Sequence, residues 1–330
     1  MKAMTYDRYG GPDVVTACEM PRPVAGKGEV LVRVTAAGIT TADWRLRASE
    51  FPGGLWLAGR LMTGLCRPRN RVLGGDFAGV VEAVGVGVTR FQSGDRVFGF
   101  SSGGHGAHAE YLTIKAEGAV ARIPVGMTEQ EAASLPFGAN CALEFLRDVA
   151  KVQPGQTVLI VGASGGVGGY AVQIAKWLGA HVTGVASGDN LDYLRDLGAD
   201  AVVDYRVTDL ATLPDRFDLV FDTVGAMRFD QAKAVLTETG LLLPLNFSAA
   251  DLPRALLSGR GGGKRMVLHV NGDSRDLVEK VADLLVSGHL RPLIDRVYPF
   301  DQIRTGYAHV ESRHRRGAVV LDIAGDGAAA

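Results

Sequence analysis

The sequence predicts an α/β protein made of a β-rich barrel and a doubly wound parallel sheet. Residues 72–100 and 107–124 hold short runs of Val, Phe and Gly, which favour a small barrel with tight turns. From residue 157 onward, apolar strand-like runs alternate with helical segments, a pattern typical of a parallel sheet with helices on both faces. The length of 330 residues also favours two domains over one core.

The β-rich part opens the chain and is expected to return at its end. Val30, Val32 and Val34 alternate with polar residues, which predicts a half-buried strand over residues 28–38. The closing run GAVVLDI (317–323) has the same character. We therefore expect the parallel-sheet part to be inserted into the β-rich part.

The parallel-sheet part is introduced by a helical segment over residues 128–150. Thr128 and Glu131 form a capping-box pattern at its start, and Pro136 and Gly138 are expected to divide it into two helices. The segments that follow read as alternating strands and helices. Strands are expected at 157–163, 181–187, 201–206, 218–225, 240–247 and 264–270, and helices at 165–180, 190–199 and 276–288.

Composition excludes several classes of protein. The formal net charge of -1 gives no basic excess for nucleic acid. The three cysteines, Cys18, Cys66 and Cys141, are too far apart for a disulfide framework or a four-cysteine zinc site. There is neither a membrane-spanning run of about 18 apolar residues nor an N-terminal apolar run of signal-peptide type. A reducing cytoplasm is the expected compartment.

The glycine-rich segment TVLIVGASGGVGGYAVQIAKWLGA is the strongest chemical signal. Gly165 allows the backbone to approach a pyrophosphate, and Gly168 allows the helix to pack closely on the strand. The helix N-terminus then offers N–H groups to the phosphates. A glycine-rich turn without ligand is the alternative, but the strand–turn–helix context favours dinucleotide binding. The predicted contacts are Ala163, Ser164, Gly165, Gly166, Val167 and Gly168.

The second strand of this unit indicates which dinucleotide binds. NAD sites usually carry Asp or Glu at its end, whereas Ser187 stands there. Ser187 and Asn190 can hydrogen-bond a 2′-phosphate, although Asp189 lies nearby, and Arg206 or Arg315 is expected to supply the positive charge. We therefore predict NADPH as the cofactor, with an ordinary strand-end turn as the alternative role of Ser187.

Several motifs together resemble the medium-chain dehydrogenase/reductase superfamily, and within it the quinone oxidoreductase (zeta-crystallin-like) branch. They are GGDFAGVVEAVGVGVTRFQSGDRVFGF, AEYL, GASGGVG, LGADAVVDY and RRGAVVLDI, in family order over nearly the whole chain. The resemblance implies a GroES-like barrel of residues 1–122 with 292–330, and a Rossmann domain of residues 123–291. Zinc-dependent members carry ligands at positions that here resemble Thr40 and Gly75, so the resemblance implies no metal.

The resemblance also indicates catalytic residues. Thr40 stands where this branch often has Asn, which implies contact with the nicotinamide or the acceptor carbonyl; a helix N-cap is the alternative. Asp43 either orients its neighbours or caps the next turn. Cys141 matches a Thr near the cofactor, with a buried small residue as the alternative, and Asn140 beside it is equally open. His105 and His108 are expected in a mobile loop, with proton donation as the alternative.

Other residues are expected around the cofactor and the acceptor. Parallel strands that end at the same sheet edge place nicotinamide contacts there, and a tyrosine can cover the adenine ribose. Apolar side chains in the glycine-rich segment 51–71 either line an acceptor pocket or cover the barrel. The predicted cofactor contacts are Tyr205, Leu245, Asn246, Phe247, Val270 and Asn271, and the predicted pocket residues are Phe51, Trp56, Leu61 and Met62.

The expected reaction is hydride transfer from NADPH to an electron-poor carbon of a quinone, an enone or a related activated C=C acceptor, with the proton taken from water. A zinc-independent alcohol dehydrogenase or carbonyl reductase is one alternative. A methyltransferase and a non-enzymatic NADPH-binding protein are the others. The expected partners are a small electrophilic acceptor and a second copy of the chain, because an apolar edge near GLLLPLNF and KRMVLHV favours a homodimer.

Overall fold

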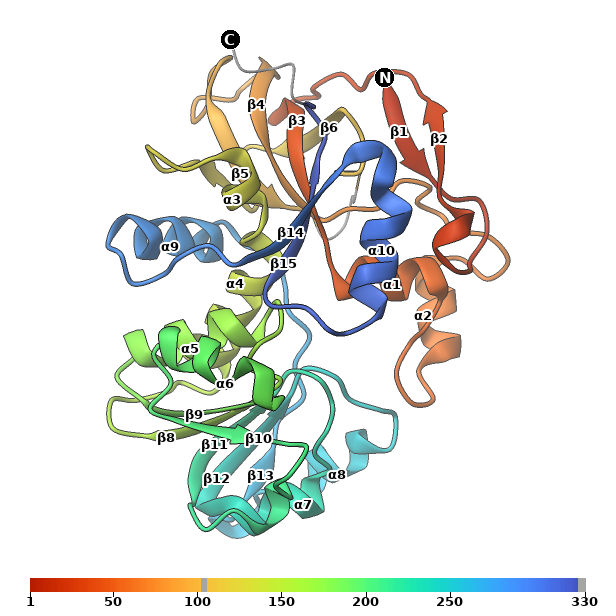
Figure 1. The fold of residues 1–330 in the computed structure, drawn as a ribbon. Helices are drawn as coiled ribbons and strands as arrows, with labels where there is room; N and C mark the ends of the chain where they lie inside the picture. Colours follow the sequence, from red (N-terminus) through yellow and green to blue (C-terminus); the bar gives the residue numbers. More distant parts are fainter. Residues whose placement is uncertain (102–105, 326–330) are drawn as a thin grey trace. The chain divides into compact units, whose positions relative to one another are not determined.

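The computed structural model describes residues 1–101 and 106–325, apart from the side chain of residue 260. The chain divides into two compact units (Figure 1). The first, here called the barrel unit, comprises Met1–Phe51, Trp56–Asn140 and the chain from Gly272 onward. The second, the sheet unit, comprises Pro52–Leu55 and Cys141–Asn271. The predicted α/β class is confirmed, and the predicted domain limits at residues 122 and 292 stay a prediction.

The barrel unit is built on a seven-stranded sheet in which the two ends of the chain meet. The predicted strand 28–38 is confirmed as β3 (Glu29–Ile39), with Val30, Val32 and Val34 buried. The closing run is β15 (Ala318–Asp322), which pairs antiparallel with β3 so that Val319 lies opposite Ile39. The order is β14-β15-β3-β4-β5-β7, with β6 also on β3. The remaining strands are β4 (Asp76–Val84), β5 (Arg96–Phe100), β6 (Tyr111–Lys115), β7 (Val120–Arg122) and β14 (Ile294–Pro299), and β1 (Lys2–Thr5) pairs with β2 (Thr16–Glu19) outside this sheet.

Helices cover this sheet, and local capping explains where two of them begin. The predicted capping box is present at α3 (Glu129–Ala133), where Thr128 Oγ1 accepts from the N–H of Glu131 at 3.2 Å and the Glu131 carboxylate accepts from the N–H of Thr128 at 2.9 Å. Pro136 opens α4 (Pro136–Leu143), which confirms the predicted division into two helices. The barrel unit also contains α1 (Thr41–Ala48), α2 (Trp56–Thr63), α9 (Arg275–Val286) and α10 (Ile303–Glu311).

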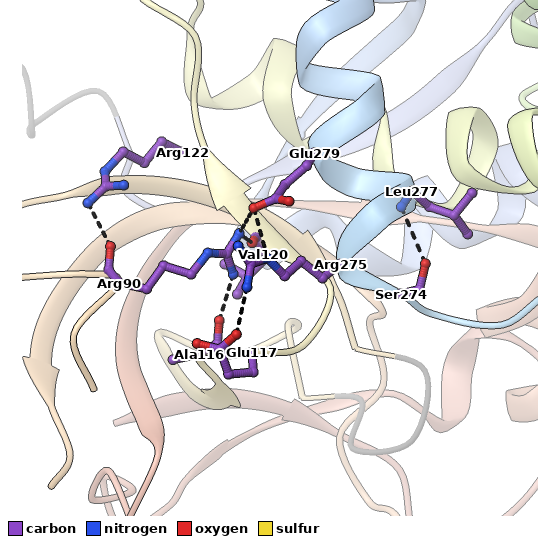
Figure 2. Close-up of polar contacts among 9 residues, drawn as sticks. All are labelled: Arg90, Ala116, Glu117, Val120, Arg122, Ser274, Arg275, Leu277 and Glu279. Carbon is purple, nitrogen blue, oxygen red and sulfur yellow. Dashed lines mark hydrogen bonds and ion pairs between the residues drawn. The ribbon is translucent and has the colours of Figure 1, made fainter. Parts of the chain in front are cut away.

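Ionic contacts fix α9 to the barrel at β7 (Figure 2). Arg90 donates to the Glu279 carboxylate at 2.5 Å, and Arg275 donates to Glu279 at 3.0 Å and to Glu117 at 2.7 Å. Ser274 caps the start of the helix through the N–H of Leu277. Although α9 follows the sheet unit in sequence, these contacts join it to the barrel unit.

The sheet unit is a six-stranded parallel sheet in the order β10-β9-β8-β11-β12-β13, which confirms the predicted doubly wound topology. The order reverses between β8 and β11, and ligands of such sheets bind beyond the carboxyl ends of the strands at this reversal. The strands are β8 (Thr157–Val161), β9 (His181–Ala186), β10 (Ala201–Asp204), β11 (Phe217–Asp222), β12 (Leu236–Pro244) and β13 (Arg265–Met266). The helices are α5 (Gly168–Trp177), α6 (Leu191–Asp196), α7 (Phe229–Val235) and α8 (Asp251–Leu257).

The predicted strand over residues 264–270 is mostly wrong. Only Arg265 and Met266 form a strand, because β13 lies at the sheet edge and has β12 alone as its neighbour. The N–H of Val267 still bonds to the carbonyl of Leu242 at 3.1 Å. Beyond that bond the chain leaves the sheet, and Val270 is 72% exposed.

Candidate functional site

The turn between β8 and α5 has one side packed tightly against protein and one side open. A Cβ on Gly168 would lie 2.1 Å from the carbonyl oxygen of Gly162, so glycine is required there for the helix to approach the strand. Gly162 has φ +77° and lies against Thr223, which also excludes a side chain. A Cβ on Gly165 would meet only the oxygen of Gly162, at 3.4 Å. The backbone at Gly165 therefore faces open space next to the N-terminus of α5, and this cradle fits a pyrophosphate.

Asp222 and Thr223 hold the end of β11 against this turn, a role that sequence reasoning missed. The buried Asp222 carboxylate accepts hydrogen bonds from the N–H groups of Val224, Gly225 and Met227 at 2.8–3.0 Å. Burial raises the pKa of Asp222, and these hydrogen bonds oppose the rise. Thr223 Oγ1 donates to the carbonyl of Val161 at 2.8 Å, which ties β11 to β8. An acid and a hydroxyl followed by Val-Gly, directly at a strand end, are the signal that could have identified them.

The residues predicted to select the nucleotide lie together at the ends of β9 and β10. Ser187 Oγ accepts from Asn190 Nδ2 at 2.9 Å. Arg206 pairs with the Asp189 carboxylate at 3.2 Å, and its backbone N–H donates to Asp204 Oδ1 at 2.9 Å. Tyr205 is 53% exposed beside them. The polar side chains of Ser187 and Asn190 and the guanidinium of Arg206 therefore lie together with the carboxylates of Asp189 and Asp204.

Of the residues predicted at the ends of β12 and β13, only some lie next to one another. Asn246 Nδ2 donates to the carbonyl of Thr223 at 3.1 Å, so Asn246 lies beside the loop that follows β11. Leu245 continues the strand pairing, since its N–H bonds to the carbonyl of Asp222 at 2.8 Å. Phe247 is half-buried beyond them, whereas Val270 and Asn271 follow the end of the short β13.

In the barrel unit, Thr40 and Asp43 bind each other as a capping box at the start of α1. Thr40 Oγ1 donates to the Asp43 carboxylate at 2.6 Å and accepts from the N–H of Asp43 at 3.2 Å. The N–H groups of Thr40 and Gly74 also donate to this carboxylate, at 2.8 and 3.1 Å. Both side chains are buried. The capping alternative is therefore present for both residues, and a catalytic role for either stays a prediction.

A second buried carboxylate, that of Asp76, and the half-buried Arg315 lie close to this pair. Asp76 accepts from the N–H of Phe137 at 2.9 Å. Burial raises the pKa of Asp76 well above its ordinary value, and the Asp43 carboxylate acts in the same direction. Arg315 donates to the carbonyl of Ile39 and to the hydroxyl of Thr41, and burial lowers its pKa to about 10. These contacts place Arg315 in the barrel unit; its predicted role toward the cofactor stays a prediction.

His108 is buried in a hydrogen-bonded chain. Its Nε2 lies 2.9 Å from the carbonyl oxygen of Gly38, and its Nδ1 lies 3.3 Å from the hydroxyl of Tyr307. A carbonyl only accepts, so Nε2 carries a proton and donates to Gly38. The predicted mobile loop is therefore wrong for His108, whose ring is buried and packed. His105 lies outside the described residues.

Comparison with known proteins identifies the family. Residues 26–125 match the alcohol dehydrogenase GroES-like domain, and residues 197–321 match a zinc-binding dehydrogenase model. An NADPH-dependent alkenal/one oxidoreductase of Arabidopsis thaliana is 30% identical over 97% of this chain and 79% of its own length. A 2-methylene-furan-3-one reductase of Solanum lycopersicum is 31% identical over the same shares. The chain belongs to the medium-chain dehydrogenase/reductase superfamily. A quinone oxidoreductase structure from Coxiella burnetii agrees, with 28% identity, a TM-score of 0.86, and coverage of 98% of this chain and 99% of that one.

The resemblance aligns Thr40 and Gly75 with zinc ligands of zinc-dependent members, and the structure gives the surroundings of both residues. Thr40 has its hydroxyl and its N–H engaged by Asp43. Gly75 has no room for a side chain, because a Cβ there would lie 2.6 Å from the ring of Phe100. Among the residues described, no three His, Cys, Asp or Glu side chains gather closely enough to hold a metal ion. The residues at these two positions do not fit a zinc ion.

The remaining predicted residues have different surroundings. Cys141 is fully buried, and burial raises the pKa of its thiol. Asn140 is 2% exposed, and neither polar atom of its amide has a hydrogen-bond partner within the described chain. Of the predicted pocket residues, Phe51 is half-buried, and Trp56, Leu61 and Met62 of α2 are exposed. None of the helices formed by residues 1–101 and 106–325 has the length and apolar character of a membrane span.

Proposed function

We propose that this member of the superfamily is an NADPH-dependent reductase that transfers hydride to a quinone, an enone or a related activated C=C acceptor without zinc. The observation that carries the proposal is the glycine turn, whose open side at Gly165 lies at the strand-order reversal of a parallel sheet. The names of the Arabidopsis, tomato and Coxiella proteins, which refer to alkenal/one, furanone and quinone substrates, support the acceptor class.

The chain's own residues would bind and orient the cofactor and the acceptor, and the dinucleotide supplies the hydride when bound. The backbone of the 162–168 turn and the start of α5 would hold the pyrophosphate. Thr223 and Asn246, joined by a hydrogen bond, form the rim of the sheet where a nicotinamide would lie. In the acceptor site, Thr40 would donate to the acceptor oxygen only after its hydroxyl rotates away from Asp43. Water is the proposed proton source.

Preference for NADPH over NADH is supported by the hydroxyl of Ser187 at the end of β9 and by the guanidinium of Arg206 near it. Asp189 and Asp204 lie in the same loops, so Arg206 must turn from Asp189 to the 2′-phosphate for this preference to hold. Zinc independence is supported by the crowding at Gly75. A cytoplasmic location and a homodimer formed through the β13 edge are further parts of this proposal.

The test is a steady-state assay of NADPH oxidation against a panel of quinones, enones, alkenals, aldehydes and ketones. Turnover of enones or quinones well above that of simple aldehydes and ketones is the expected result. Faster turnover of unconjugated carbonyls would instead support a zinc-independent carbonyl reductase. Cofactor binding without turnover of any member of the panel would support the non-enzymatic alternative.

A further inference from the structure

Helix α2 packs its polar side against the protein and exposes its apolar side, which is the reverse of an ordinary surface helix. Its inward side carries Gly59, which is buried against the ring of Phe51, together with the partly buried Arg60 and Thr63. Its outward side carries two pairs four residues apart, Leu57 with Leu61 and Ala58 with Met62. Residues four apart share one face of a helix, so the outward face is wholly apolar. Leu57, Leu61 and Met62 are 57%, 53% and 77% exposed.

Specific contacts hold α2 in this orientation. The hydroxyl of Tyr9 donates to the carbonyl of Gly64 at 2.8 Å and lies 3.1 Å from Thr63 Oγ1. The guanidinium of Arg60 lies 3.8 Å from the centre of the Tyr9 ring and 5.4 Å from that of Trp56. The polar side of the helix is therefore bound to the barrel unit, and the apolar side chains of Leu57, Leu61 and Met62 are exposed. Figure 1 shows where α2 lies in the fold.

A basic loop continues this face. Leu65 is 53% exposed, and Arg67, Arg69 and Arg71 are exposed after it. Arg69 donates to the carbonyl of Met62 at 3.3 Å, which ties the loop to the end of the helix. Residues 51–75 contain four arginines and no Asp or Glu. We call Leu57, Ala58, Leu61, Met62, Leu65, Arg67 and Arg69 the α2 surface.

We propose that the α2 surface binds the headgroup region of an anionic membrane. An apolar helix face beside a cluster of arginines is the combination that lies at a lipid interface, with the apolar side chains among the acyl chains and the cations among the phosphates. A second copy is the poorer occupant, since a two-fold axis through this small surface would bring the arginines of both copies close together. The contact is peripheral, and it does not rest on the proposed function.

Vesicle co-sedimentation of the full chain tests the proposal. The probes are vesicles of phosphatidylcholine alone and vesicles that also contain phosphatidylglycerol. Binding to the anionic vesicles only, weakened by added salt, is expected. The emission of the 52% exposed Trp56 should shift to shorter wavelength and be quenched by brominated lipid. Trp56→Phe should remove this signal, because Trp44 is buried and Trp177 lies in α5 of the sheet unit. If the folded chain does not co-sediment with the anionic vesicles, the proposal is overturned.

Matched variants test the surface itself. The triple change Leu57→Ser, Leu61→Ser and Met62→Ser should weaken partitioning about tenfold or more, since it removes the inserted apolar area. The control is Leu252→Ser, Leu256→Ser and Leu257→Ser in α8, three leucines that are likewise more than half exposed. Arg67→Glu with Arg69→Glu should also weaken binding, and Arg8→Glu with Arg195→Glu is the matched charge control. Equal losses in test and control variants overturn the proposal.

Two other outcomes would assign the surface to a different occupant. If the α2 triple variant converts a dimer into a monomer in sedimentation velocity, with vesicle binding unchanged, a second copy covers the surface. If the variant raises the KM for a water-soluble quinone in lipid-free buffer, with vesicle binding unchanged, the surface belongs to the acceptor pocket that the sequence predicts. Either result overturns the membrane proposal.

Discussion

Arg315 donates a hydrogen bond from Nη2 to the hydroxyl of Thr41 at 2.9 Å and another from Nη1 to the carbonyl of Ile39 at 3.3 Å. These two residues flank Thr40, so the half-buried Arg315 holds both neighbours of a predicted catalytic residue. The carboxylates of Asp43, Asp76 and Asp295 favour the charged form of Arg315 and oppose its desolvation. The loop at Thr40 is therefore fixed by charge as well as by its capping box.

Arg315→Met should destabilise the protein by about 1–3 kcal/mol, because it removes the two hydrogen bonds to Ile39 and Thr41 and a positive charge near Asp43 and Asp76. Arg315→Lys should cost less, since it keeps the charge but cannot reach both oxygens with the planar geometry of a guanidinium. Denaturant unfolding of the apo protein measures both. Equal stability of the methionine variant and the parent would show that Arg315 contributes no net stabilisation.

Asp76→Asn should change how stability depends on pH. The pKa of Asp76 is raised in the folded protein, so its contribution to stability is complete below the unfolded pKa near 3.8 and is lost as pH rises through the folded pKa. Asparagine keeps an oxygen for the N–H of Phe137 and removes this loss. The Tm of the variant relative to the parent should rise by a few degrees as the pH is raised from about 4 toward neutral. Asp13→Asn, an exposed carboxylate, is the control, and a pH-independent difference for Asp76→Asn would contradict the argument.

Ser187→Asp should weaken NADPH binding about tenfold or more, because it adds a negative charge close to the 2′-phosphate. Ser187→Asn is the matched control of similar size without charge, and its effect should be small. Fluorescence titration with NADPH and NADH measures both affinities. Equal affinity of the parent protein for the two cofactors would refute the predicted preference.

Exhaustive chelation should leave reductase activity unchanged, since Thr40 and Gly75 provide no ligand that fits zinc. Activity with the best acceptor of the panel is compared before and after chelation, and metal content is measured on the same samples. A loss of activity that added zinc restores would show that a metal site exists elsewhere in the chain.

The features that could be predicted from the sequence are those set by residues close to one another along the chain. The glycines of the 162–168 turn were visible because a strand that turns directly into a helix leaves no room for a Cβ at Gly168. The capping box at Thr128 was visible because Glu131 is three residues away, and a helix N-cap was one of the two alternatives for Thr40. The barrel was predicted mainly from the family motifs, because short β runs alone indicate a barrel only weakly.

The features that could not be predicted from the sequence depend on packing between residues far apart along the chain. The partners of Arg315 lie 274 and 276 residues away in the chain, and no pattern along the sequence connects them. The short β13 and the packed state of His108 likewise follow from neighbours that are distant in sequence. The apolar residues of α2 were visible, but their outward orientation depends on Tyr9, which holds the polar side of the helix.

Gly165→Ala and Gly168→Ala add the same methyl group to the same turn and should have different effects. At Gly165 the methyl meets only one oxygen, at 3.4 Å, so the apo protein should melt within about a degree of the parent. The methyl would instead occupy the space for the pyrophosphate, and most of the NADPH-induced rise in Tm should disappear. At Gly168 the methyl would lie 2.1 Å from the backbone oxygen of Gly162, so the apo Tm should fall by several degrees.

Melting curves of both variants, with and without saturating NADPH, measure these effects. The Gly168→Ala variant controls for a general disturbance of the turn, because it alters the packing of α5 on β8 and not the open side. If Gly165→Ala keeps the full NADPH-induced rise in Tm, the phosphates do not bind at this backbone. The dinucleotide would then have to be placed elsewhere on the sheet edge, because the open side at Gly165 would have no ligand.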